Sequence, residues 1–206
     1  MTSFSAIEKF KISRETVNLL EYYVELLTKW NKSINLVSSD SLKDCWKRHI
    51  EDSLQLWRFV HKDYTKWVDF GSGAGFPGLV IALLALEKLP SLSVKLIESD
   101  KRKCVFLGEA SRVLGVKVEI FPLRIENVPS QNADVVSARA LCSLKELLFF
   151  SKIHRKNNGI SLFFKGKNLP QEIKNAIKTH KFDHTIFPSL TDKESYILRV
   201  ENHNYD

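Results

Sequence analysis

The sequence predicts a single α/β domain, in which a mostly parallel sheet ends in an antiparallel strand and follows a helical N-terminal segment. From residue 63 onward, short apolar runs alternate with amphipathic segments, which is typical of a parallel sheet with helices on both faces. Near the C-terminus, two apolar runs are joined by only about seven residues, too few for a helical crossover. We therefore expect these last two strands to be antiparallel.

Length and composition limit the protein to a few classes. The chain has 206 residues, enough for one well-buried core and few for two. Hydrophobic residues make up 44% and charged residues 27%, as in globular chains. The longest apolar run, residues 79–86, is too short to span a bilayer, and the N-terminus lacks a secretory signal pattern. The three cysteines form no CxxC pair. We expect a cytoplasmic protein with reduced thiols, no membrane association and no metal.

The first segment, residues 1–62, is predicted to be helical. Ser13 is a suitable N-cap, and apolar residues follow it at helical spacing, at Val17, Leu20, Val24, Leu27 and Trp30. After a polar break at residues 31–40, a second helix is predicted from Ser41, with an apolar stripe at Leu42, Trp46, Ile50, Leu54 and Trp57.

The remaining residues, 63–206, are predicted to form the α/β core. Strands at 67–70, 94–98 and 134–137 are each followed by a helix, at 77–88, 101–114 and 143–155 respectively. A further strand at 116–122 is followed by a loop, and the chain ends with strands at 160–165, 184–188 and 196–201.

A glycine-rich turn, residues 71–78, lies between the first predicted strand and its helix. Glycine permits a tight turn and lets a ligand approach the backbone closely. The helix that follows offers free N–H groups and a partial positive charge. Because ligands of open α/β sheets usually bind at the carboxyl ends of the strands, this turn predicts a nucleotide or nucleoside site.

Two ligand patterns fit this turn. Gly73-x-Gly75-x-x-Gly78 matches the dinucleotide pattern, with Glu98 about 20 residues later, where an acid binds the ribose. Gly71-x-Gly73-x-Gly75 after Asp69 instead resembles the first motif of Rossmann-like S-adenosylmethionine methyltransferases, in which an acid after the second strand also holds a ribose. The chain has no room for the substrate domain of a dehydrogenase, and its antiparallel final pair is typical of these methyltransferases. Asp69 can accept a hydrogen bond from an amino group.

Six segments together resemble one family, RsmG, also called GidB. They occur in order: Asn31-Lys32-x-Ile34-Asn35-Leu36, Arg48-His49-Ile50-x-Asp52-Ser53-Leu54, Asp69 to Gly78, Ile97-Glu98-Ser99, Ala138-Arg139-Ala140 and Leu162-x-x-Lys165-Gly166. The family consists of bacterial methyltransferases that modify N7 of one guanine in small-subunit (16S) ribosomal RNA with S-adenosylmethionine. The resemblance covers nearly the whole chain. One departure is Val37, where the family commonly has a threonine.

The resemblance implies a Rossmann-like fold and a set of site residues. For S-adenosylmethionine these are Asp69, Gly71, Gly73, Phe76, Glu98, Ile125, Glu126 and Arg139. For the base or the RNA, the candidates are Asn35, Arg48, His49 and Lys165. The N-terminal segment is expected to pack over the cofactor edge of the sheet and to form part of the RNA-binding cleft.

The implied reaction needs no strong general base, because guanine N7 already carries a lone pair. No catalytic residue is therefore assigned, and His49 and Arg139 are the candidates for the reaction cleft. The enzyme must align N7 with the methyl group, an effect of roughly 7–11 kcal/mol in favourable model systems. An Arg or Lys donor can hold the neighbouring O6. Arg48 has an alternative, structural reading as an ion pair with Asp52.

The charge of the chain has two readings, a surface that attracts a polyanion such as RNA and an ordinary solvated basic face. The net charge is +7, and residues 147–171 contain no acid but several basic residues, at Lys152, Arg155, Lys156, Lys165 and Lys167. The resemblance implies small-subunit ribosomal RNA or the 30S subunit as the partner, and we expect a monomer as the active form. The alternatives are a nicotinamide-dependent oxidoreductase that uses Gly73–Gly78, a non-catalytic RNA-binding protein, and a small-molecule methyltransferase.

Overall fold

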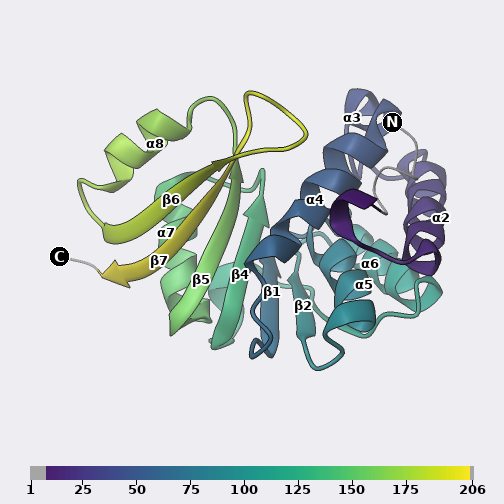
Figure 1. The fold of residues 1–206 in the computed structure, drawn as a ribbon, viewed down its shortest axis with the longest axis horizontal. Coiled ribbons are helices and arrows are strands. Elements are labelled where there is room, and N and C mark those ends of the chain that lie inside the picture. Colours follow the sequence, from purple (N-terminus) through teal and green to yellow (C-terminus); the bar gives the residue numbers. More distant parts are fainter. Residues whose placement is uncertain (1–7, 205–206) are drawn as a thin grey trace.

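A seven-stranded sheet with the order β3-β2-β1-β4-β5-β7-β6 forms the centre of the computed structural model, which describes residues 8–204 (Figure 1). Strands β1 to β5 are parallel, and β7 runs antiparallel to both β5 and β6. The strands are β1 Lys66–Phe70, β2 Ser93–Ile97, β3 Val118–Phe121, β4 Ala133–Arg139, β5 Arg155–Lys165, β6 Lys181–Pro188 and β7 Tyr196–Asn204. The predicted fold class, with its antiparallel strand near the C-terminus, is confirmed.

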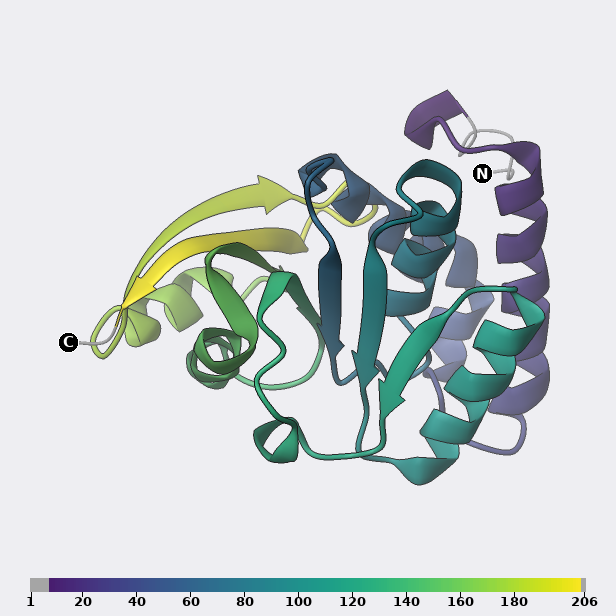
Figure 2. The same cartoon turned by 90° about the horizontal axis from the view of Figure 1, so that it is seen from below.

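Helices cover both faces of this sheet (Figures 1 and 2). They are α2 Arg14–Asn31, α3 Ser39–Lys43, α4 Asp52–Leu54, α5 Gly78–Lys88, α6 Lys101–Val113, α7 Leu144–His154 and α8 Leu169–Ala176. Trp46–Glu51 is a π-helical turn, and Gln55–Phe59 and Ile125–Asn127 are 3₁₀ turns. Within residues 8–204, no helix is both long and apolar enough to cross a membrane.

Alternate residues of the strands enter two separate cores, because successive side chains of a strand point to opposite faces. Trp67 and Leu96 belong to the core that contains the N-terminal helices, α5 and α6. Val68 and Ile97 belong to the core under α7 and α8. The N-terminal segment is thus continuous with the packing on one face of the sheet.

Helix α2 begins as predicted, because the Ser13 side chain accepts a hydrogen bond from the backbone N–H of Thr16 at 3.1 Å. Its apolar stripe also packs as predicted, with Val17, Leu20 and Leu27 buried and Val24 and Trp30 partly buried against the same core.

The predicted second helix is wrong in detail. It is interrupted at Asp44, and a π-helical turn and a 3₁₀ turn replace regular α-helix on either side of α4. Residues 49–56 are all buried, which one face of an α-helix cannot achieve. This segment is enclosed by other elements on several sides, and π-helical turns are frequent at functional sites.

Two further differences concern the second half of the chain. Helix α8 was not predicted, although Pro170 lies in its first turn, where proline is favoured. Strand β5 begins at Arg155 rather than at residue 160, and its pairing with β4 shifts register between Ala133 and Val135.

Candidate active site

Two adjoining cavities lie where the parallel strands end. The first, of about 410 Å³, is enclosed by the glycine turn, the end of β2, the 3₁₀ turn at Ile125–Asn127 and residues 36–38. The second, of about 460 Å³, lies between the π-helical turn, the end of β5, α8 and the loop that joins β6 to β7. Both volumes are typical of small-molecule sites. The cavities share the side chains Ser41, His49, Arg139, Ala140 and Leu141.

The glycine turn forms the floor of the first cavity. Gly73 and Gly75 have φ values of 57° and 91°, which favour glycine because other residues are strained there. The backbone N–H of Gly73 donates to Glu98 Oε2 at 2.8 Å. The Tyr23 hydroxyl of α2 donates to the carbonyl of Ala74. The turn is therefore held from both the sheet and the N-terminal segment.

Asp69 supports the turn from below instead of lining the cavity. Its side chain is completely buried, accepts from the Ser137 hydroxyl at 2.6 Å and from the N–H of Gly78 at 3.3 Å. Burial raises its pKa to about 6, and these hydrogen bonds oppose that rise. The expected contact of Asp69 with a ligand is therefore corrected: the residue has no access to the cavity.

Glu98 forms one wall of the first cavity at the end of β2. Its Oε2 accepts from Gly73 and its Oε1 from the N–H of Asp100 at 2.8 Å. Each carboxylate oxygen keeps a further lone pair. Glu98 is thus fixed in orientation and can accept hydrogen bonds from a pair of hydroxyl groups.

The opposite wall is the 3₁₀ turn that contains Ile125 and Glu126. Ile125 is buried, whereas Glu126 is exposed. The carbonyl of Ile125 lies 3.2 Å from Nε2 of His154, which is completely buried at the end of α7. This wall therefore offers an apolar side chain and a carboxylate on a supported turn.

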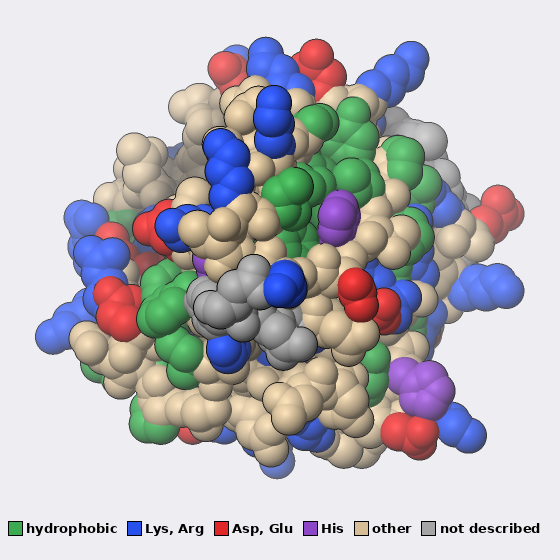
Figure 3. Space-filling model, turned by 90° about the vertical axis from the view of Figure 1, so that its left-hand side faces the viewer, with side chains coloured by type: hydrophobic (Ala, Val, Ile, Leu, Met, Phe, Trp, Pro, Cys, Tyr) green, Lys and Arg blue, Asp and Glu red, His purple; other side chains and the backbone are tan. Residues whose placement is uncertain are grey.

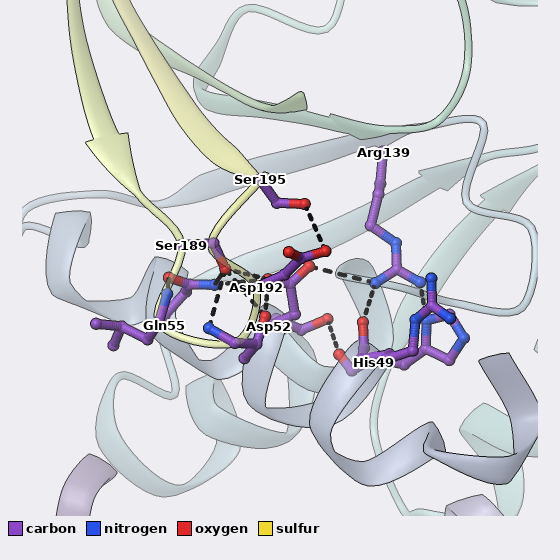
Figure 4. Close-up of polar contacts among 11 residues, drawn as sticks. His49, Asp52, Gln55, Arg139, Ser189, Asp192 and Ser195 are labelled. Atoms are coloured by element: carbon purple, nitrogen blue, oxygen red, sulfur yellow. Dashed lines mark hydrogen bonds and ion pairs between the residues drawn. The ribbon is translucent and has the colours of Figure 1, made fainter. Parts of the chain in front are cut away.

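Arg139, the last residue of β4, lines both cavities. Figure 4 shows its side chain directed toward His49 and Asp52. Its guanidinium donates to the carbonyl of Arg48 at 2.9 Å and to Nδ1 of His49, and it lies 3.5 Å from Asp52 Oδ2. It also lies 5.4 Å from the centre of the Phe76 ring. Asp52 thus pairs with Arg139, and among residues 8–204 no ion pair of Arg48 with Asp52 is found.

His49 is held as a neutral group beside Arg139. Its ring stacks on Phe76 with centroids 4.9 Å apart and planes 11° apart. Burial, and then the charges of Arg139 and Arg48, lower its pKa to about 3. Because Nδ1 accepts from Arg139, the proton of the neutral ring lies on Nε2. His49 is therefore a poor candidate for a general acid at neutral pH.

The second cavity carries one further charged pair and a docked loop. Lys165 Nζ donates to Glu172 Oε2 at 2.7 Å and to the carbonyl of Cys142 at 3.1 Å. Asp52 Oδ1 accepts from the side chains of Gln55, Ser189 and Thr191 at 2.7, 3.0 and 2.9 Å. These bonds fix the β6–β7 loop against α4 and the 3₁₀ turn that follows it.

A comparison with known families matches residues 16–198 to GidB, described as rRNA small subunit methyltransferase G. The chain belongs to the GidB family. A relative from Ruegeria sp. (strain TM1040) is 44% identical over 92% of each chain, and one from Parvibaculum lavamentivorans is 44% identical over 96% of this chain and 87% of its own. Both bear the name ribosomal RNA small subunit methyltransferase G.

Solved structures share the fold of this GidB chain at low identity. A SAM-dependent methyltransferase from Aquifex aeolicus has a TM-score of 0.59 at 15% identity, covering 75% of this chain and 90% of its own. The PH0226 protein from Pyrococcus horikoshii has a TM-score of 0.61 at 11% identity, covering 84% and 98%. The fold is that of S-adenosylmethionine-dependent methyltransferases, and the dinucleotide pattern of the glycine turn is not favoured.

The candidates that the GidB resemblance implies fall into two groups in space. Those for the cofactor line the first cavity, with Asp69 as the exception: Gly71, Gly73, Phe76, Glu98, Ile125, Glu126 and Arg139. Of those for RNA, Arg48, His49 and Lys165 line the second cavity. Asn35 is exposed and lines neither cavity. It is Asn31 of the same motif that organises this loop, by bonding the backbone of Leu36 and Val37.

Four residues near the cavities were missed by sequence reasoning. Tyr23 lies on the buried face of α2, where nothing in the sequence distinguishes it from an ordinary core residue. Asp52 belongs to the motif at residues 48–54, but its expected ion-pair partner was Arg48, whereas the structure pairs it with Arg139. Gln55 and Glu172 carry no signal in the sequence, because their positions depend on loops from distant parts of the chain.

The basic stretch at residues 147–171 is not an open basic surface. Arg155 is buried and donates to the carbonyls of Gly159 and Glu201, Lys156 pairs with Asp134, and Lys165 pairs with Glu172. On the face drawn in Figure 3, Lys and Arg side chains are scattered among acidic and apolar ones rather than gathered into one patch. Much of the charge of this stretch is therefore balanced within the protein, which supports the reading as an ordinary basic face for Arg155, Lys156 and Lys165.

Proposed function

We propose that this chain transfers the methyl group of S-adenosylmethionine to N7 of a guanine in small-subunit ribosomal RNA. The observation that carries the proposal is the pair of cavities that meet at Arg139 and His49. A reaction between two bound molecules needs two sites that share a wall. The names of the GidB relatives support the substrate class, and a cytoplasmic, monomeric enzyme acting on ribosomal RNA remains our prediction.

The first cavity fits S-adenosylmethionine. Glu98 is oriented to accept from the two ribose hydroxyls, and Ile97 and Ile125 offer apolar contact to the adenine ring. Glycines at the turn let the ligand approach the backbone. The bound cofactor supplies an electrophilic methyl group on a sulfonium. Asp69 contributes indirectly, because it anchors Gly78 and the strand below the turn.

The residues at the shared wall suit a reaction that needs no proton removal. N7 attacks through its own lone pair, so a neutral His49 is no disadvantage. The protein's part is to orient the base, to hold O6 and to exclude water. Arg139 is the donor that we propose for O6, and its charge beside the developing cation is balanced by Asp52.

The decisive experiment uses S-adenosylmethionine with a tritiated methyl group and 30S subunits from cells that lack this enzyme. We expect label in 7-methylguanosine after digestion of the RNA, with a rate that falls as salt is raised, because RNA contacts release counterions. Label in another nucleoside would refute the assignment to N7. Label absent from the RNA, with cofactor bound, would refute the substrate class.

The cofactor site is tested separately by titration calorimetry. Glu98→Gln is expected to weaken S-adenosylmethionine binding about tenfold or more, because a charged acceptor is lost. Glu109→Gln is the matched control, since Glu109 pairs with Arg112 on α6 and lines neither cavity. Tight binding of NADH with no affinity for S-adenosylmethionine would favour the oxidoreductase alternative instead.

A further inference from the structure

An ion pair with unused hydrogen-bonding capacity lines the second cavity. The side chain of Lys165 is 7% exposed and that of Glu172 is 29% exposed, with 2.7 Å between Nζ and Oε2. Lys165 is the last residue of β5, and Glu172 lies in the first turn of α8. The roles described above for the glycine turn and for Arg139 do not involve this ion pair.

Both members of the pair are held in place from a second side. Lys165 also donates to the carbonyl of Cys142, and Glu172 Oε2 also accepts from the N–H of Leu144 at 2.8 Å. An ammonium group has three N–H donors, so one remains for a ligand. Among residues 8–204, the hydrogen bonds of Glu172 all go to Oε2 and none is found for Oε1. The pair therefore presents one donor beside one acceptor.

This order of donor and acceptor complements one purine. On the Watson–Crick edge of guanine, the O6 acceptor lies next to the N1–H donor, followed by the N2 amino group. Adenine has the reverse order, an N6 amino donor next to an N1 acceptor, and would face two mismatches. Leaving buried polar groups unpaired rejects an analogue strongly.

The same arrangement leaves N7 free for the reaction. N7 lies on the other side of O6 from N1, so a base held at its Watson–Crick edge keeps N7 exposed. In the second cavity, Arg139 and His49 form the wall toward the first cavity, and Lys165 and Glu172 belong to β5 and α8. Leu141 and Phe164 offer apolar contact for the face of the ring.

We propose that Glu172 and Lys165 are specificity-determining residues that read the Watson–Crick edge of the acceptor guanine in the second cavity. Lys165 donates to the lone pair of O6 that faces N1, the lone pair on the N7 side being left to Arg139, and Glu172 Oε1 accepts from N1–H. The family resemblance named Lys165 as a candidate for contact with the base or the RNA, and this proposal assigns it to the base. Glu172 is not among the residues that the resemblance implies. This inference rests on the proposed methylation of guanine N7.

The test combines a protein variant with a base analogue. 30S subunits are reconstituted with 16S RNA that carries either guanine or 2-aminopurine at the methylated position. 2-Aminopurine keeps N7 and the N2 amino group, but it lacks O6 and has an acceptor at N1. The measured quantity is kcat/KM for methyl transfer, with S-adenosylmethionine affinity and thermal unfolding followed for each variant.

We expect Glu172→Gln to lower kcat/KM on guanine subunits about 10-fold to 100-fold, because a charge-assisted acceptor becomes a donor. On 2-aminopurine subunits, Glu172→Gln should have the same kcat/KM as the wild-type enzyme on that substrate. Its affinity for S-adenosylmethionine should be unaltered. Glu109→Gln, which also removes an ion pair, should behave as wild type on both substrates. An equal loss from Glu172→Gln on both substrates would overturn the proposal.

One measurement needs no variant and covers the case in which Glu172→Gln does not fold. Wild-type enzyme that methylates 2-aminopurine as efficiently as guanine would refute reading of the Watson–Crick edge. Wild-type enzyme that labels neither substrate, while still binding S-adenosylmethionine, would refute the proposed function itself. The two failures are therefore distinguishable.

Discussion

At the scale of single residues, Arg139 shows how one side chain can organise two cavities. A guanidinium has five N–H donors in a rigid plane, so it can serve several acceptors at once. Here it contacts His49, Asp52 and the carbonyl of Arg48 while its face lies near Phe76. A lysine has neither the planar fork nor the reach for all of these contacts. The shared wall is therefore stiff, which suits a reaction that depends on alignment.

The Tyr23 hydroxyl joins the N-terminal segment to the glycine turn, and its removal should affect both stability and ligand binding. Tyr23→Phe leaves the buried carbonyl of Ala74 without this donor, at a cost of about 1–2 kcal/mol in the free energy of unfolding. We also expect weaker S-adenosylmethionine binding, because the turn is less constrained. Urea unfolding and calorimetry measure the two effects.

Tyr22→Phe is the matched control for this change. Tyr22 is the neighbour of Tyr23 on α2 and is 48% exposed, so loss of its hydroxyl should alter the free energy of unfolding by less than about 0.5 kcal/mol. Equal effects of the two substitutions would show that the bond to Ala74 contributes nothing specific.

His49 should make stability depend on pH in a definite direction. Its pKa is about 3 in the folded protein against 6.5 for the free side chain, so the unfolded chain binds the proton first. The contribution of neutral His49 to the free energy of unfolding is complete above pH 6.5. It is lost as pH falls toward 3, at up to about 1.4 kcal/mol per pH unit. The charges that face it are Arg139, Arg48 and, through Arg139, Asp52.

His49→Gln should remove this part of the dependence of the free energy of unfolding on pH. We expect the unfolding free energy of the variant to decline less steeply than that of wild type between pH 7 and pH 5 in urea titrations. Parallel curves for wild type and His49→Gln would contradict the assignment of a buried, neutral His49.

At the scale of elements, the sequence predicted regular packing well and irregular packing poorly. The apolar stripe of α2 and the alternation of strands and helices are local patterns, so they could be read from neighbouring residues. The π-helical turn at Trp46–Glu51 could not, because it follows from burial of consecutive residues by elements far away in the chain. Helix α8 has only eight residues and too few periods to stand out.

The β6–β7 loop is an element whose position depends on a few side-chain hydrogen bonds. Ser189→Ala removes a bond to Asp52 Oδ1 and one from the N–H of Thr191, so the loop should detach more readily from α4. We expect a loss of about 1 kcal/mol in local stability. Hydrogen exchange at residues 189–195 should become faster, while exchange in β1 and β4 stays unchanged.

Ser195→Ala is the control within the same loop. Its hydroxyl bonds to Asp192, which lies in the loop itself, and not to α4 (Figure 4). Exchange at residues 189–191 should therefore remain as in wild type. The docking role of Asp52 would be wrong if both serine variants accelerated exchange at those residues equally.

At the scale of the whole molecule, strand order explains which site residues could be predicted. The order β3-β2-β1-β4 brings the ends of β1, β2 and β4 together, so candidates located after those strands converge on the first cavity. The sequence could not tell that Asp69 is enclosed beneath the turn, because its burial depends on Ser137 of β4. The second cavity required the β6–β7 loop and α8, whose packing no local pattern reveals.

One packing arrangement at this scale supports our prediction that residues 1–62 and 63–206 form a single domain. Leu20 of α2 is completely buried in the core that also contains Leu79 of α5 and Trp67 of β1. Leu20→Ala should lower the free energy of unfolding by about 2–5 kcal/mol, the usual cost of a cavity in a core. Because the core is shared, the loss should extend to the sheet, so amides of β1 and β4 should exchange faster by global unfolding.

Leu86→Ala provides the matched control for this last prediction. Leu86 lies on α5 and is 53% exposed, so the same truncation there should change stability by no more than about 0.5 kcal/mol. If Leu20→Ala accelerated exchange in α2 alone and left β1 and β4 as in wild type, the N-terminal segment would be a separate folding unit. The glycine turn would then gain its contact with Tyr23 only after docking, and cofactor affinity would follow the population of the docked state.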